Sequence, residues 1–102
     1  MYDLVIIGSG AAGLSAAIYA GRYRMKTLVI GKELGGETAS AGAIENYPGV
    51  KAVEGYDLIK TMREQSEALG VEIVKGAVSA VPRDGHCFSI VAGEKTYESH
   101  TL

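Results

Sequence analysis

Apolar runs and helical periodicity alternate along the first third of the chain. The runs at residues 3–7 and 27–30 are rich in β-branched residues and are typical of strands buried on both faces, as in parallel sheets. Between these runs the apolar positions have the i, i+3, i+4, i+7 spacing of an amphipathic helix, at Leu14, Ala17, Ile18 and Gly21. The pattern predicts a right-handed βαβ unit with parallel strands.

The periodicity stops after the second run. Residues 31–55 are rich in glycine and hold no sustained pattern, which predicts a long functional loop without secondary structure of its own. A helix is expected over 57–69, because Gly70 follows as a terminator, and a third buried strand is expected over 71–74. Turn residues then separate three short strand candidates, at 77–81, 87–91 and 96–99. We expect these to form a β-meander over 77–99.

These elements together predict an α/β fold, Rossmann-like and three-layered, with a parallel sheet plus a small antiparallel meander. A parallel sheet of only three strands would leave apolar edges unpaired, a liability that intact domains avoid. We therefore expect an incomplete domain. A complete small domain whose edges are covered by a partner is the alternative.

Composition narrows the class of protein further. A chain of 102 residues makes one domain, and 47% apolar with 22% charged residues is typical of a folded one. A net charge of −2 offers no basic field for nucleic acid or an anionic membrane. No apolar run reaches the roughly 20 residues of a membrane span, and no export signal is visible, so a cytoplasmic location is expected.

The single cysteine, Cys87, excludes an internal disulfide and a metal site built from several thiolates. It lies in a strand candidate, where a structural role is expected. His86 and His100 lack metal-ligand spacing, so we assign no metal ligand and no catalytic residue.

A glycine motif joins the first strand to the helix. Gly8 to Gly13 read Gly-Ser-Gly-Ala-Ala-Gly and fit G-x-G-x-x-G in its strand–turn–helix context. Gly8 permits the sharp turn, Gly10 lets a pyrophosphate approach the backbone, and Gly13 lets the helix pack closely on the strand. Free amides of the first helical turn then face the phosphates. A glycine-rich turn without a ligand is the alternative.

The same motif expects an acidic residue about 20 positions later, at the end of the second strand, to bind ribose hydroxyls. Glu33 has that spacing from Gly13, but Gly31 and Lys32 occupy the strand end. Glu33 is therefore either a displaced ribose ligand or an ordinary surface glutamate.

Residues 3–102 resemble the N-terminal part of bacterial and archaeal thioredoxin reductases and related two-domain flavoproteins. The resemblance rests on the glycine motif with residues 14–20, on Gly35-Gly36-Glu37, on Glu-Asn-Tyr-Pro-Gly at 45–49, and on the helix and strand at 62–74. It implies that the chain is the N-terminal part of a domain that binds FAD, with residues 31–55 as the cofactor-contacting loop. It further implies that an NADPH domain and a C-terminal FAD segment are missing from these 102 residues.

Roles carry over from the resemblance position by position. The pyrophosphate of FAD would be held by Gly8, Ser9, Gly10, Ala11, Ala12 and Gly13. The remaining contacts would run from the adenosine ribose at Lys32 and Glu33, along the ribityl chain and flavin at Gly35, Gly36 and Glu37, to Asn46 near the flavin and to Val78 at the adenine edge. Two departures stand out: Glu37 replaces a usual glutamine, and Gly31 replaces the usual acid.

The implied function is the FAD-binding portion of an enzyme that passes electrons from NAD(P)H through FAD to the disulfide of a thioredoxin-like protein. The resemblance also implies a homodimer for the intact protein, and this portion alone should be inactive. Two alternatives stay open. One is a ferredoxin– or flavodoxin–NADP reductase of the same fold, which lacks the redox dithiol; the other is a stand-alone dinucleotide-binding module without turnover.

Overall fold

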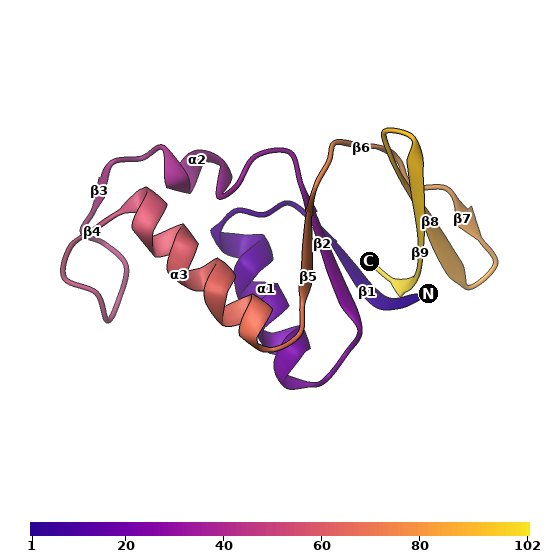
Figure 1. Cartoon of the computed structure of the whole chain (residues 1–102), viewed down its shortest axis with the longest axis horizontal. Coiled ribbons are helices and arrows are strands. Elements are labelled where there is room, and N and C mark those ends of the chain that lie inside the picture. Colours follow the sequence, from indigo (N-terminus) through magenta and orange to yellow (C-terminus); the bar gives the residue numbers. More distant parts are fainter.

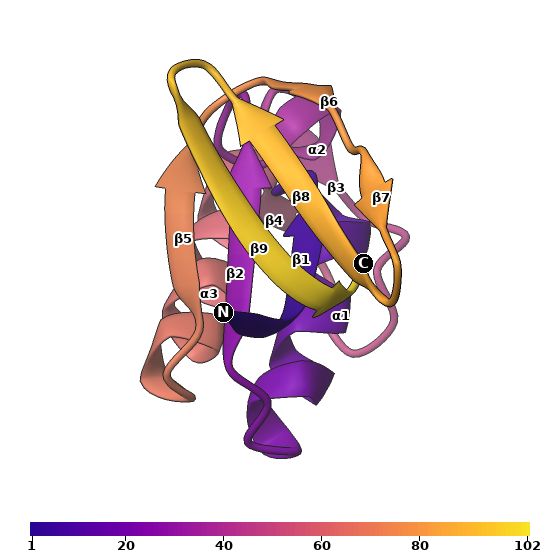
Figure 2. The same cartoon turned by 90° about the vertical axis from the view of Figure 1, so that its right-hand side faces the viewer.

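The computed structural model describes residues 1–102, and its elements form three layers (Figure 1). Two helices lie on one face of a parallel sheet, and an antiparallel sheet lies on the other face. Figure 2 shows the antiparallel strands crossing in front of the parallel ones. No helix has both the length and the apolar character needed to span a bilayer.

The parallel part of the sheet contains β1 (Tyr2–Ile7), β2 (Thr27–Gly31) and β5 (Glu72–Lys75). β2 lies in the middle, with Val5 opposite Leu28 on one side and Val29 opposite Ile73 on the other. The predicted βαβ unit with parallel strands is confirmed, and β2 is buried over its whole length.

The helices α1 (Ala11–Arg22) and α3 (Gly55–Ala68) cover one face of the sheet. α1 buries Leu14, Ala17, Ala20 and Gly21, so Ala20 takes the inward place that the periodicity gave to Ile18. The two helices meet in a cluster of buried side chains, Leu14, Leu58, Ile59 and Met62. This cluster anchors the start of α3 beside the start of α1.

The antiparallel strands are β6 (Val78–Ala80), β7 (Arg83–Asp84), β8 (Cys87–Ala92) and β9 (Lys95–Thr101). β8 pairs with β6, β7 and β9, as a meander requires. β9, however, runs beyond the predicted meander and pairs with β1 in parallel, Tyr2 opposite Ser99 and Leu4 opposite Thr101. The two sheets are therefore one sheet in the order β5-β2-β1-β9-β8-β6, and the expected free edge of β1 is partly covered.

The sequence predicted that β1 is buried on both faces, and this prediction is wrong. Only Val5 is fully buried, and 46% of Ile7 is exposed. Val5 lies under the antiparallel layer, against Leu28 and Ile90. β9 pairs with the first half of β1 only, so the end of β1 that leads into the glycine motif has an open side.

The segment 31–55 is not a featureless loop. It contains the single-turn helix α2 (Gly36–Ala39) and an antiparallel pair, β3 (Ala43–Ile44) with β4 (Val53–Glu54). Gly55 is buried, and a Cβ there would overlap the carbonyl oxygen of Thr38. Elements of two to four residues are too short to produce a sequence period, which is why the pattern did not reveal them.

Candidate functional site

The glycine motif forms a tight turn between β1 and α1. Gly8 has a φ of +113°, which residues with a side chain rarely adopt. A Cβ on Gly13 would overlap the carbonyl oxygen of Gly8, so the helix can approach the turn this closely only with glycine there. A Cβ on Gly10 would instead meet only Gly35 O, at an ordinary contact distance of 3.6 Å, so packing within the chain does not require glycine there.

The first turn of α1 presents main-chain donors that nothing in the chain accepts. Leu14 N donates to Gly10 O at 2.9 Å, but the amides of Ala11, Ala12 and Gly13 have no backbone acceptor. No side chain caps the helix, and its first turn holds no acidic residue. Because a helix start also carries partial positive charge, this end of α1 is suited to an anion.

A cavity of about 360 Å³ lies against this turn. We call it the turn cavity; it is lined by Gly8, Ser9, Gly10, Lys32, Glu33 and Gly36. All six are residues for which the sequence predicted cofactor contacts. The lining has no apolar side chain, and it combines one cation with one carboxylate, which suits a polar ligand.

Two hydrogen bonds tie the chain after β2 to the glycine turn. Ser9 Oγ donates to Glu33 O at 2.7 Å, and Gly35 N donates to Ser9 O at 3.0 Å. Ser9 is buried against the last residue of β2, so that a Cβ on Gly31 would overlap its hydroxyl. This close approach explains the missing acid at the strand end: any side chain on Gly31 would displace Ser9.

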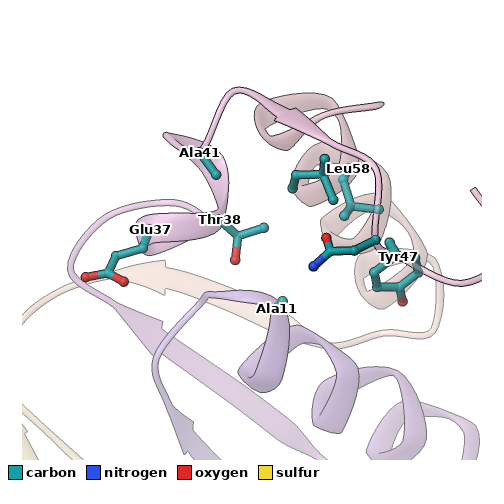
Figure 3. Close-up of a pocket in the computed structure, with 8 residues that line it drawn as sticks. Ala11, Glu37, Thr38, Ala41, Tyr47 and Leu58 are labelled. Carbon is teal, nitrogen blue, oxygen red and sulfur yellow. The ribbon is translucent and has the colours of Figure 1, made fainter. Parts of the chain in front are cut away.

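A second cavity, of about 380 Å³, lies on the other side of the α1 start (Figure 3). We call it the outer cavity; its lining comes from the starts of α1 and α3 and from the segment that runs from α2 through β3 into the loop before β4, namely Ala11, Glu37, Thr38, Ala41, Ile44, Asn46, Tyr47 and Leu58. In Figure 3 Thr38 points toward Ala11, whereas the Glu37 carboxylate points away from Tyr47 and Leu58. The lining is mostly apolar, so this cavity suits a flat, largely apolar group.

The predicted site residues are thus mostly brought together. Six line the turn cavity, while Ala11, Glu37 and Asn46 line the outer cavity. Ala12 and Gly13 contribute their amides at the helix start, and Gly35 is buried against Ile59.

Val78 is the exception among the predicted site residues. It lines neither cavity; it is half-buried at the start of β6, where it packs against the core under the antiparallel layer. Its proposed contact with the adenine edge stays a prediction.

The sequence missed several residues of the outer cavity. Thr38 and Ala41 lie in or just after α2, and Ile44 lies in β3, two elements that carry no periodic signal. Leu58 lies in the predicted helix over 57–69, and nothing in the sequence distinguished it as a site residue.

Outside the two cavities we considered the single cysteine and the side chains that could ligate a metal ion. Cys87 is half-buried in β8, with its Sγ 4.0 Å from Nδ1 of His100 on β9. No group of three or more histidine, cysteine, aspartate or glutamate side chains is close enough together to hold a metal ion.

The two cavities and the helix start between them fit a dinucleotide. Each cavity has a volume typical of small-molecule sites, which span about 300–1,000 Å³. The unpaired amides provide for a pyrophosphate, the polar turn cavity for a ribose, and the apolar outer cavity for a ring system. In FAD the pyrophosphate joins the adenosine ribose to the ribityl chain that carries the flavin, which matches a helix start between the polar and the apolar cavity.

Comparison with known proteins agrees with this geometry. The family model described as pyridine nucleotide-disulphide oxidoreductase matches residues 2–102. A thioredoxin reductase of Peptoclostridium acidaminophilum is 43% identical over 97 residues, which cover 93% of this chain and 30% of that protein. The chain thus spans about a third of the length of such relatives.

Solved structures give the same result. A crystal structure of Lactococcus lactis thioredoxin reductase superimposes with a TM-score of 0.94 at 39% identity, over 98% of this chain and 33% of that one. A ferredoxin–flavin thioredoxin reductase of Clostridium acetobutylicum does so with a TM-score of 0.82 at 33% identity, over 97% of this chain and 35% of that one. The chain belongs to the pyridine nucleotide-disulphide oxidoreductase family, and it corresponds to the N-terminal, FAD-binding segment of a thioredoxin-reductase-like protein.

Proposed function

We propose that residues 1–102 bind the pyrophosphate, ribose and flavin parts of FAD in an enzyme that passes electrons from NAD(P)H to a protein disulfide. The observation that supports this most strongly is the unpaired helix start of α1, which lies between a polar and an apolar cavity. The family match over residues 2–102 supports the same assignment.

In this proposal the glycine turn holds the phosphates. The amides of Ala11, Ala12 and Gly13 donate to phosphate oxygens, and the absence of a Cβ on Gly10 leaves room for the approach. The hydrogen bonds of Ser9 fix the following loop against the turn. These donors are in place before the ligand arrives, which lowers the entropy cost of binding.

The two cavities orient the rest of the molecule. Lys32 and Glu33 lie at the ribose end, and the main chain at Gly35 and Gly36 leads from the turn cavity to the outer cavity. There Asn46 provides an amide side chain for the polar edge of the flavin, while apolar side chains such as Leu58 exclude water from one side of the ring.

When bound, FAD supplies the ability to accept a hydride and to return its electrons to a disulfide; the protein contributes binding and electrostatics. We assign no catalytic acid, base or nucleophile to these residues and propose that they are inactive alone. In the intact enzyme we propose a further NAD(P)H domain, a thioredoxin-like partner, a homodimer and a cytoplasmic location.

A second candidate exists for the electron donor of the intact enzyme. One structural neighbour is a ferredoxin–flavin thioredoxin reductase, so a ferredoxin is the second candidate for the donor. The donor does not bear on the FAD contacts proposed for this chain.

FAD titration of the purified 102-residue chain tests the proposal. Quenching of flavin fluorescence should saturate at one FAD per chain, and ADP should displace it, because the phosphates provide much of the binding. Tight ADP binding with no gain from the flavin half would instead support a dinucleotide module without flavin chemistry. No binding of either ligand would refute the proposed site.

A further inference from the structure

A third, smaller cavity lies beside the turn cavity and shares Ser9 with it. We call it the side cavity. It has a volume of about 120 Å³, room for about four waters, which matches a tetrahedral oxyanion. Its seven lining residues include two cations, Arg63 on α3 and Lys75 on β5. Ser9, and Gly31 at the end of β2, also line it, and the other three residues are apolar, Leu34, Ile73 and Val74.

Both cations have donors to spare. Arg63 Nε donates to Glu67 Oε1 at 3.1 Å, and this partly exposed ion pair uses one of five guanidinium N–H groups. Lys75 has no carboxylate within 4.0 Å, and neither has Lys32 in the turn cavity next to it. The residues that line the side cavity thus include two cations and no carboxylate, in a chain whose net charge is −2.

The residue at the end of β2 decides which adenine riboses such a fold accepts. An acidic residue there bonds the ribose 2′-hydroxyl and repels a 2′-phosphate, whereas a nearby cation accommodates that phosphate. Here the position is Gly31, which the buried Ser9 keeps free of any side chain. This same residue lines the side cavity, together with the two cations.

We infer that the side cavity is a phosphate subsite, formed by Arg63 and Lys75, that takes an oxyanion next to an adenosine ribose bound in the turn cavity. The inference rests on the proposed function, since it needs the ribose in that place. It adds that a 2′-phosphorylated adenine nucleotide competes with FAD for this chain better than its unphosphorylated counterpart.

Calorimetry with 5′-ADP, 2′,5′-ADP, 3′,5′-ADP and inorganic phosphate tests the subsite on the 102-residue chain. The 2′,5′-ADP should bind about five- to tenfold more tightly than either other nucleotide, because two cations bond the added phosphate at a solvent-accessible site. Arg63→Gln and Lys75→Gln should each reduce this affinity ratio to about its square root, because each removes one of the two cations that bond the phosphate.

Two other cations serve as matched controls. Lys60→Gln on α3 and Lys95→Gln on β9 remove an exposed charge that lines none of the three cavities, so the advantage should survive in both. If the control variants lose it equally, the preference reflects net charge and the subsite is overturned.

The outcomes also separate the source of the oxyanion from the proposed function. Equal nucleotide affinities, with inorganic phosphate binding that Arg63→Gln and Lys75→Gln abolish, would assign the subsite to free phosphate. Equal nucleotide affinities without phosphate binding would overturn the subsite but leave the dinucleotide site intact. If no nucleotide binds, the proposed function fails first and the ribose-linked subsite fails with it.

Discussion

At the scale of single residues, neighbouring glycines have different tasks. Gly13 is required by packing, since a Cβ would overlap Gly8 O, whereas a Cβ on Gly10 would make only an ordinary contact with Gly35 O. The G-x-G-x-x-G pattern predicted both tasks from spacing alone. The reason for Gly31 was out of reach of the sequence, because it depends on Ser9, which is distant along the chain.

Substituting these two glycines should separate folding from binding. Gly13→Ala should lower the free energy of unfolding by about 3 kcal/mol, since the overlap is with rigid backbone. Gly10→Ala, at a φ of −81°, should cost less than about 1 kcal/mol yet weaken FAD binding by at least tenfold. Urea unfolding and FAD titration measure the two effects. A Gly10→Ala chain that binds FAD normally would contradict the placement of the phosphates.

Tyr2 predicts a specific dependence on pH. Burial, then the hydrogen bond that its hydroxyl donates to Glu72 at 2.7 Å, then the Glu72 charge, raise its pKa from 10.0 to about 12. A pKa raised by folding contributes stability that is complete below about pH 10 and is lost as pH rises toward 12. The melting temperature should therefore fall more steeply over this range in the wild type than in Tyr2→Phe. Parallel curves would show that Tyr2 ionises alike in both states.

At the scale of elements, length and periodicity decided what the sequence could predict. The helices α1 and α3 and the strands β1, β2 and β5 were all predicted, because each contains an apolar run or a helical period long enough to be recognised in the sequence. α2, β3 and β4 were not, although α2 and the residues around β3 form much of the outer cavity. They are held by tertiary contacts, such as the close approach of Gly55 to Thr38 O, that leave no local pattern.

The support of α2 by α3 can be tested at Ile59. This fully buried side chain packs with Leu14 and lies directly under Gly35, so its loss should loosen the turn that leads into α2. Ile59→Ala should cost about 2–5 kcal/mol of unfolding free energy and also weaken FAD binding several-fold in the remaining folded protein. Leu69→Ala, at a residue that is 40% exposed, should cost about 1 kcal/mol and leave binding unchanged. If Ile59→Ala and Leu69→Ala change FAD binding equally, the packing of α3 under α2 does not support the site.

At the scale of the whole molecule, the sequence predicted three layers but not how the parallel and antiparallel strands are connected. The turn residues between the last short strands indicated an antiparallel meander, and nothing local indicated that β9 would also pair with β1. That parallel pairing places the antiparallel layer over Val5, Leu28 and Ile30 and leaves the helices to the other face. The glycine turn and both cavities lie at the carboxyl ends of the parallel strands, where open α/β sheets bind ligands.

The central claim is that the start of α1 binds the pyrophosphate while the two cavities take the ends of FAD. Amide chemical shifts of the isotope-labelled chain, recorded during FAD titration, test it most directly. The largest shifts should fall on Ala11, Ala12 and Gly13, with Lys32, Glu33 and Asn46 also affected, whereas ADP should shift the first five and spare Asn46. Shifts spread over the antiparallel strands, with the α1 start unchanged, would contradict the account.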